Sequence, residues 1–179
     1  MILSLLICTL PARRDMLDRL LAEIKSQQLA CGVEIEVLCD AGEGTVGAKR
    51  QRLLEKAQGD YVAFIDDDDE IMPSYLSAIL GALSTSPDVI GFTGIMTTNG
   101  TRPERFRLSK DFNYEKKKGI YYRYSNHLCP VRRELAMQVG FKDTAWGEDY
   151  DYATRLQPML KTEVFIEKNL YHYKYLSKK

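Results

Sequence analysis

The first half of the chain alternates between short apolar runs and amphipathic helical segments. Ile2 to Cys8 is an apolar run broken only by Ser4, which is typical of a strand buried on both faces of a sheet. Strands separated by single helices pair in parallel through right-handed crossovers. The sequence therefore predicts a doubly wound α/β fold with a mostly parallel central sheet and helices on both faces. Strands are predicted at 2–8, 33–37, 61–65 and 89–92, with helices at 13–29 and 45–58 and a third that has Pro73 in its first turn.

The second half is less regular. Asn99 and Gly100 are typical of a hairpin turn. Arg102 to Tyr124 is basic and aromatic, and we expect a loop that leads into a strand. No internal repeat or low-complexity linker interrupts the chain, so one domain over residues 1–179 is predicted. Further helices are expected at 132–139 and 148–156, and short strands at 120–124, 164–166 and 170–175.

Composition excludes several classes of protein. The chain has 179 residues, 45% of them hydrophobic, which is ordinary for a globular protein. Lys and Arg together number 25, as do Asp and Glu, so nothing favours binding of nucleic acid by bulk charge. The apolar start has no charged leader, and no segment reaches the roughly 20 apolar residues of a membrane span. We therefore expect no transmembrane segment.

The four cysteines suggest the compartment. Cys8, Cys31, Cys39 and Cys129 have no C-x-x-C spacing, which argues against a zinc site and a redox pair. Cys8 and Cys39 lie at the ends of apolar runs and are expected to be buried thiols. The expected location is the cytoplasm.

Four adjacent carboxylates, Asp66 to Asp69, follow directly on a predicted buried strand. Such neighbours repel one another, and a divalent cation such as Mg²⁺ or Mn²⁺ compensates them. A solvated acidic turn is the alternative. An EF-hand does not fit, because the sixth position from Asp66 is Ile71 and the twelfth is Ser77. Ligands of doubly wound sheets bind at the carboxyl ends of strands, so we interpret the cluster as a metal site.

The stretch from Val46 to Asp69 resembles the central signature of the family 2 glycosyltransferases, which have the GT-A fold. In that signature a helix with an Arg near its start leads through Ala-x-Gly to a strand and a D-x-D motif. The resemblance implies that Asp68 binds Mn²⁺ or Mg²⁺, and that Asp66 contacts the ribose or a metal-bound water. It places Asp67 among the residues that bind the nucleotide sugar. Asp69 is expected to cap the following helix.

The same resemblance extends to positions around the predicted sheet. Thr9, Pro11 and Arg14 correspond to the loop beside the nucleotide base, and Asp40 to an acidic residue that binds uracil. Arg50 corresponds to an Arg that reaches the base or the diphosphate. A turn Asp is an equal alternative for Asp40, since Asp is favoured in turns. A surface Arg is the alternative for Arg50, and Lys49, Arg52 and Lys56 are expected to lie on the surface.

A second stretch, Trp146 to Leu156, resembles the family's Gly-Glu-Asp motif at a helix start. The resemblance implies that Asp149 is the catalytic base and that Glu148 orients the acceptor, with Asp151 as a further candidate base. Trp146 is expected to stack on a sugar. Carboxylates at a helix N-terminus are also favoured by the helix dipole alone, which is the structural alternative.

The two histidines of the chain have different expected roles. His172 corresponds to the C-terminal His that binds the metal in many GT-A enzymes, and a packed, hydrogen-bonded His is the alternative. His127 matches no motif and is expected to be structural.

The resemblance implies a metal-dependent, inverting transferase that moves a sugar from a nucleotide diphosphate, with UDP-sugars favoured, to a hydroxyl of a saccharide or other acceptor. Residues 1–98 would bind the nucleotide and residues 99–179 the acceptor. One alternative is a degenerate GT-A module that binds without turnover. A sugar nucleotidyltransferase is less favoured, because Thr9 to Arg14 has no glycine where those enzymes have G-x-G-T-R.

Overall fold

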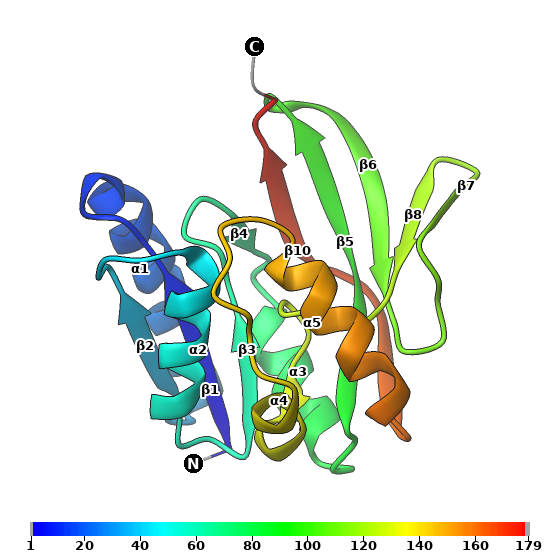
Figure 1. The fold of residues 1–179 in the computed structure, drawn as a ribbon, viewed down its shortest axis with the longest axis horizontal. Helices are drawn as coiled ribbons and strands as arrows, with labels where there is room; N and C mark the ends of the chain where they lie inside the picture. The colour runs from blue at the N-terminus through cyan, green and yellow to red at the C-terminus, as the bar shows by residue number, and fades with distance from the viewer. Residues whose placement is uncertain (1, 178–179) are drawn as a thin grey trace.

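A computed structural model describes residues 2–177; Met1, Lys178 and Lys179 lie outside the described part. The strands join in one ten-stranded sheet with helices packed on its faces (Figure 1). In chain order the elements are β1 (Leu3–Cys8), η1 (Pro11–Arg13), α1 (Arg14–Cys31), β2 (Glu36–Asp40), α2 (Val46–Lys56), β3 (Tyr61–Phe64), β4 (Glu70–Ile71), α3 (Tyr75–Leu83), β5 (Val89–Thr98), β6 (Thr101–Leu108), β7 (Glu115–Lys117), β8 (Ile120–Arg123), β9 (Val131–Arg132), α4 (Arg133–Val139), α5 (Glu148–Leu156), η2 (Gln157–Met159) and β10 (Glu163–Tyr175).

The sheet order is β2-β1-β3-β9-β5-β6-β8-β7, with β10 alongside β5 and β4. β1 pairs in parallel with both β2 and β3, and β10 pairs in parallel with β5. The short strand β9 lies antiparallel between β3 and β5. The predicted α/β fold is confirmed, whereas β9 was not predicted.

Local sequence explains the elements of the first half. β1 is fully apolar apart from Ser4 and is almost wholly buried. Gly32 ends α1 in the left-handed conformation with φ 65°, where glycine has no steric penalty. Thr45 caps α2 by accepting a hydrogen bond from the backbone N–H of Ala48, as predicted.

Helix α3 begins later than the sequence predicted. Pro73 precedes the helix, which starts at Tyr75 after the N-cap residue Ser74. The backbone N–H of Met72 donates to the carbonyl of Leu170, so the chain stays bonded to β10 through Met72, and a turn closed by the Tyr75 N–H and the Met72 carbonyl then leads into the helix.

The strand predicted at 120–124 is confirmed as β8, but the segment before it, predicted as a loop from residue 102, instead forms strands β6 and β7. We call residues 101–123, which hold the three strands, the arm. The Asn99-Gly100 hairpin is confirmed: both residues have positive φ, 51° and 72°, as a type I′ turn requires. In β6 only Phe106 and Leu108 are buried, while charged residues alternate with them. Because so many of its residues are charged, the sequence predicted a loop here, whereas the structure has a half-exposed strand.

The two short strands expected near the C-terminus are one strand, β10. Its register with β5 shifts between Ile166 and Asn169, and again between Asn169 and Tyr171. This irregularity falls in the gap between the two predicted strands, so the sequence showed the interruption but not the continuous pairing. Among the described residues no helix has the length and apolar character to cross a membrane.

Candidate active site

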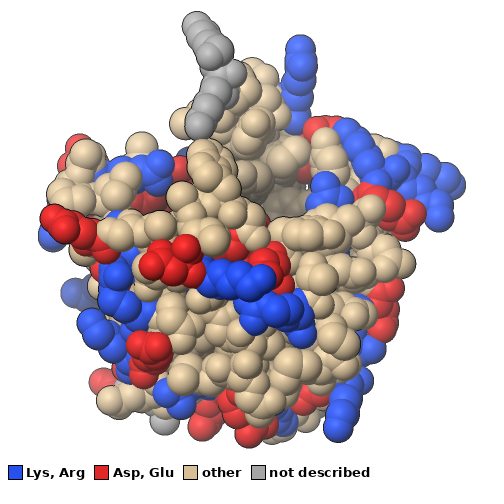
Figure 2. Space-filling view, in the orientation of Figure 1, with Lys and Arg blue, Asp and Glu red and all other residues tan. Residues whose placement is uncertain are grey.

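A cleft of about 1000 Å³ lies at the carboxyl ends of β1 and β3 and extends toward the arm. Residues of both halves of the chain line it, among them the acidic cluster and the start of α5. Lys and Arg side chains gather on the β7–β8 side of the molecule, at the upper right of Figure 2. Eight predicted site residues line this cleft: Thr9, Arg50, Asp66, Asp67, Asp68, Trp146, Glu148 and Asp149.

The four carboxylates alternate in exposure. The side chains of Asp66 and Asp68 are 29% and 31% exposed, whereas Asp67 and Asp69 are each only 1% exposed. The open pair is the predicted D-x-D pair. Asp66 and Asp68 therefore present carboxylates to the cleft, and the other two have partners inside the protein.

Asp67 is bound by two residues that follow β1. Thr9 Oγ1 donates to Asp67 Oδ2 at 2.6 Å, and Arg13 Nη1 donates to Oδ1 at 2.8 Å. The same Arg13 nitrogen lies 3.2 Å from Asp68 Oδ2. Burial, reinforced by Asp66 and Asp67, raises the pKa of Asp68, while Arg13 opposes the rise. Arg13 thus compensates part of the negative charge that the sequence pattern alone indicated a metal would compensate.

Asp69 does not cap the following helix, contrary to expectation. The hydroxyl of Tyr171 donates to Asp69 Oδ2 at 2.8 Å, and the backbone N–H of Lys174 donates to Oδ1 at 2.7 Å. Burial, together with the nearby charge of Asp66, raises the pKa of Asp69 to about 8. Its role is to fasten the acidic loop to β10.

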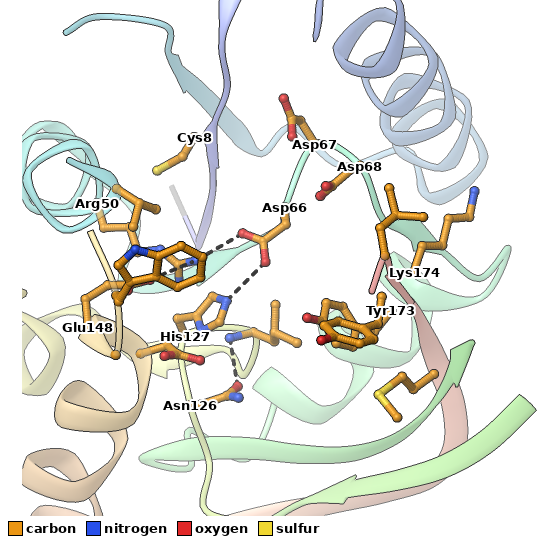
Figure 3. Close-up of a pocket in the computed structure, with 18 of the residues that line it drawn as sticks. Cys8, Arg50, Asp66, Asp67, Asp68, Asn126, His127, Glu148, Tyr173 and Lys174 are labelled. Atoms are coloured by element: carbon orange, nitrogen blue, oxygen red, sulfur yellow. Dashed lines mark hydrogen bonds and ion pairs between the residues drawn. The ribbon is translucent and has the colours of Figure 1, made fainter. Parts of the chain in front are cut away.

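Asp66 lies between a cation and a histidine (Figure 3). Arg50 Nη2 donates to Asp66 Oδ1 at 3.1 Å, and His127 Nε2 lies 3.5 Å from Oδ2. Burial alone would raise the pKa of Asp66, but Arg50 and His127 together hold it well below its ordinary value. Asp66 is therefore a permanent carboxylate at neutral pH.

Arg50 joins the two acidic motifs. Its guanidinium is 3.6 Å from Glu148 Oε1 as well as 3.1 Å from Asp66, and the residue is only 4% exposed. The rings of Phe64 and Phe141 lie 5.6 and 5.9 Å from its Cζ. Burial disfavours the charged form, yet the two carboxylates raise the pKa of Arg50 above its usual value. Two of its nitrogens, Nε and Nη1, are buried without a hydrogen-bond partner.

The loop before α5 is packed against the start of α2. The backbone N–H of Gly47 donates to the carbonyl of Thr144, and a Cβ on Gly47 would lie 1.9 Å from the carbonyl oxygen of Lys142. Trp146 projects from this loop and is 77% exposed. The close backbone contact sets where Glu148 enters the cleft.

Asp149 is half-buried at the start of α5 and lines the cleft, with its Oδ1 accepting from the backbone N–H of Tyr150. Asp151, the further candidate base, does not line the cleft. It pairs with Lys142 and with Arg155, whose guanidinium also donates to the carbonyls of Val139 and Gly140. Asp151 thus anchors α5 to the end of α4.

Four predicted site residues lie outside the cleft lining: Pro11, Arg14, Asp40 and His172. Arg14 pairs with Asp18 on the surface of α1, and Pro11 opens the exposed turn η1. Asp40 accepts from Arg52 Nε at 2.8 Å and from the backbone N–H of Gly42.

His172 also lies apart from the acidic pair. Its Nε2 is 2.9 Å from Thr97 Oγ1, and its Nδ1 is 3.3 Å from a carboxylate oxygen of Glu70. The flanking residues Tyr171 and Tyr173 point toward the acidic side instead, because neighbouring strand residues face opposite sides of the sheet.

Several lining residues were not found from the sequence. Arg13, not Arg14, faces the cleft, because η1 sets the helix register. Lys49 is buried, contrary to expectation, and its Nζ donates to the carbonyl of Thr9 at 2.8 Å. His127 was expected to be structural, but its backbone carbonyl accepts from Phe64 N–H, which places the ring beside Asp66. The polar stretch Ser125-Asn126-His127 before an apolar run was the available signal.

The chain is similar in structure to TarS of S. aureus: to a 1–349 form in complex with UDP-GlcNAc, with TM-score 0.71 and 15% identity over 100% of this chain and 60% of that one. A 1–349 form in complex with UDP gives TM-score 0.69 and 14% identity, over 98% of this chain and 61% of that one. A further structure of S. aureus TarS gives TM-score 0.70 and 15% identity, over 98% of this chain and 37% of that one.

The chain spans about 60% or less of these structures, and at such identity the likeness establishes the fold, which is GT-A. No curated protein matches in sequence. Residues 34–140, more than half of the chain, match the family described as Glycosyl transferase family 2. The α/β fold, the acidic cluster after β3 and this match together show that the chain belongs to the family 2 glycosyltransferases.

Proposed function

We propose that the protein is a metal-dependent, inverting glycosyltransferase that moves a sugar from a UDP-sugar to an acceptor hydroxyl. One observation carries the proposal: Asp66 and Asp68 from one half of the chain, and Glu148 and Asp149 from the other, face a single cleft. Arg50 ties the two pairs together. The similar TarS structures in complex with UDP-GlcNAc and UDP support a UDP-sugar as the donor.

Asp66 and Asp68 fit a Mg²⁺ or Mn²⁺ ion. Both carboxylates are partly open to the cleft, and hard divalent cations prefer such oxygens. Among the described residues no group of three His, Cys, Asp or Glu is placed to hold a metal. A site with two protein ligands suits an ion that shares its coordination with substrate phosphates and water. When bound, the ion would act as a Lewis acid on the leaving diphosphate. His172 is not part of this proposed ligand set.

The nucleotide is proposed to bind where β1 ends, in the half formed by residues 1–98. Thr9 and Asp67 lie at this end of the cleft, and Arg50 offers a cation close to Asp66. Asp40 lies on the neighbouring strand, with one carboxylate oxygen engaged by Arg52. Thr9, Asp67 and Arg50 form the proposed donor site. Pro11, Arg14 and Asp40 remain outside its lining.

Asp149 is the proposed base that takes the proton of the acceptor hydroxyl. Glu148, which is only 6% exposed and is paired with Arg50, is proposed to orient the acceptor. A single base opposite the leaving group gives direct displacement and inversion. Trp146, highly exposed beside them, supplies an aromatic face for an acceptor sugar. A reducing, cytoplasmic location is also proposed, because all four cysteines are free.

The test measures UDP release from UDP-GlcNAc and UDP-glucose with Mn²⁺, with water and a panel of simple sugars as acceptors. Asp149→Asn is expected to lower the rate by about a hundredfold or more without weakening UDP binding. Asp151→Asn is the matched control on the same helix, since Asp151 does not line the cleft and pairs with Lys142 and Arg155 instead. UDP binding without any release by the wild type would indicate a degenerate binding module. Equal losses in the two variants would remove Asp149 as the base.

A further inference from the structure

The cleft has two chemically different ends. At one end lie the carboxylates of Asp66 and Asp68, which follow β3, and at the other lie side chains of the arm, which is separated from β3 in the sheet by β9 and β5. Asp149 lines the cleft from α5. The arm end is aromatic and cationic: Tyr121 and Arg123 project from β8. A molecule that spans the cleft meets negative charge at one end and positive charge at the other.

Arg123 is fixed in place without a carboxylate partner. Its Cζ lies 5.1 Å from the ring centroid of Tyr114 and 5.0 Å from that of Tyr121. Its Nη1 donates to the backbone carbonyls of Tyr122 at 2.8 Å and Glu115 at 3.3 Å. Its Nε and Nη2 make no hydrogen bond to the described residues and are not buried. A preorganised guanidinium with two free donors suits an anion with two oxygens.

The other charges of the arm do not neutralise Arg123. Glu104, the acidic residue of this end of the cleft, is paired with Lys116 and accepts from the Tyr121 hydroxyl at 3.2 Å. Lys117 and Lys118, at the turn between β7 and β8, form no ion pair with a described residue. This is the side on which Lys and Arg gather in Figure 2. The arm is therefore net positive.

Tyr114 lies between Arg123 of the arm and helix α5, which carries Asp149. Its ring lies 5.0 Å from that of Tyr150, the neighbour of Asp149 in α5, and it also contacts the ring of Tyr124 and the guanidinium of Arg123. Burial, with the Asp149 charge adding to it, raises the pKa of Tyr114 to about 12, so the hydroxyl remains a hydrogen-bond donor at neutral pH. Arg123 and Asp149 thus approach the cleft from opposite sides of one tyrosine.

We propose that Arg123, framed by Tyr114 and Tyr121, binds an anionic group of the acceptor, a phosphate or a carboxylate. The inference rests on the proposed transferase function and names the class of its acceptor. The carboxylates at the far end repel such a group, so charge alone orients the acceptor with its anion at the arm and its hydroxyl toward Asp149. Affinity then comes from a charge-assisted, two-point contact beside an aromatic face.

The experiment titrates the ¹⁵N-labelled protein, saturated with UDP and Mg²⁺, with glucose, glucose 6-phosphate and glucuronate, and follows backbone amide shifts. The two anionic sugars are expected to bind at least about tenfold more tightly than glucose, and to shift the amides of Tyr114, Tyr121 and Arg123. Tighter binding of glucose 6-phosphate than of glucuronate identifies phosphate as the preferred group, and the reverse identifies carboxylate.

Variants separate Arg123 from the general charge of the arm. Arg123→Gln should abolish the preference for anionic sugars, and Arg123→Lys, which retains the charge, should retain part of it. Arg105→Gln is the control, because Arg105 lies on neighbouring β6 outside the cleft lining and faces Glu167 at 3.5 Å. The preference should survive in that variant.

Equal binding of the three sugars, binding of none, or the same loss in Arg105→Gln as in Arg123→Gln would overturn the inference. The UDP titration of the same samples tests the transferase proposal separately. If UDP binds and the anionic preference is absent, only the acceptor class is wrong. If UDP does not bind, the donor site itself is in error. If Arg123→Gln does not fold, the wild-type preference and Arg123→Lys decide the question.

Discussion

Among the residues that the structure describes, Arg50 is the one cation that forms ion pairs with both acidic motifs, and replacing it by Met removes that charge. Met has a similar length and fits an apolar site, so the change deletes the charge while largely conserving the packing against Phe64 and Phe141. Asp66 and Glu148 then lose a guanidinium at 3.1 and 3.6 Å. Glu148 is nearly inaccessible to water, so its negative charge is left without compensation.

The expected cost follows from this burial. Removing one partner of a buried ion pair typically destabilises a protein by about 3–5 kcal/mol. Asp66 retains 29% of its side-chain exposure and the His127 contact, which places the expected loss near the lower end, about 3 kcal/mol. For a chain of this size about 1 kcal/mol shifts the Tm by about 2–4 °C. Arg50→Met should therefore lower the Tm by about 6–12 °C.

The assay is calorimetric or urea unfolding at pH 7, with Arg52→Met as the control. Arg52 lies on the same helix, is 38% exposed and pairs with Asp40, so solvent screening keeps the loss in Arg52→Met well below that in Arg50→Met. Adding Glu148→Gln to Arg50→Met should recover part of the lost stability, because it removes the uncompensated charge. A loss in Arg50→Met no larger than that in Arg52→Met would refute the reasoning.

Two further predictions concern the elements around the cleft. Gly47→Ala should destabilise the protein by about 1–3 kcal/mol in urea unfolding, because its Cβ would overlap the carbonyl of Lys142. Gly81→Ala, with open space around its Cβ in α3, should stabilise the protein by about 0.5–1 kcal/mol. A stabilising Gly47→Ala or a destabilising Gly81→Ala would contradict the packing described for that site. Pairing with Lys142 and Arg155 lowers the pKa of Asp151, so its stabilising effect is present above its unfolded pKa of about 4 and is lost as the pH falls through the lowered value. Asp151→Asn should therefore cost stability at pH 7 and progressively less as the pH is lowered below about 4, and a loss that does not change with pH would remove the electrostatic explanation.

The sequence predicted the first half of the fold well, because its periodicities are local. The apolar run of β1 and the Thr45 cap each depend on residues close in the chain. The later elements depend on distant partners. Met72 remains extended because its N–H donates to Leu170, and β6 is a strand because β5 and β8 flank it. No short-range pattern contains that information.

The same division applies to the site. The sequence could predict Asp66 and Asp68 as the pair open to the cleft, because they follow directly on a strand and are two positions apart, so that both side chains lie on the same side of the chain. Arg13 was missed in favour of Arg14, because a single turn of 3-10 helix changed which side chain faces the cleft. His127 reaches Asp66 across 61 positions of sequence, through a backbone hydrogen bond to Phe64. Such contacts require the folded sheet.

The most direct test of the central claim is thermal unfolding with UDP, GDP, dTDP and CMP, each with and without Mn²⁺, for the wild type and Asp68→Ala. A ligand that binds only the folded protein at about 100 times its Kd stabilises it by about 2.7 kcal/mol, or about 5–11 °C here. We predict this shift for UDP with Mn²⁺ in the wild type, a smaller one without metal, and loss of the metal-dependent part in Asp68→Ala. The absence of a shift with every nucleotide, with or without metal, would contradict the assignment of the cleft as a donor site.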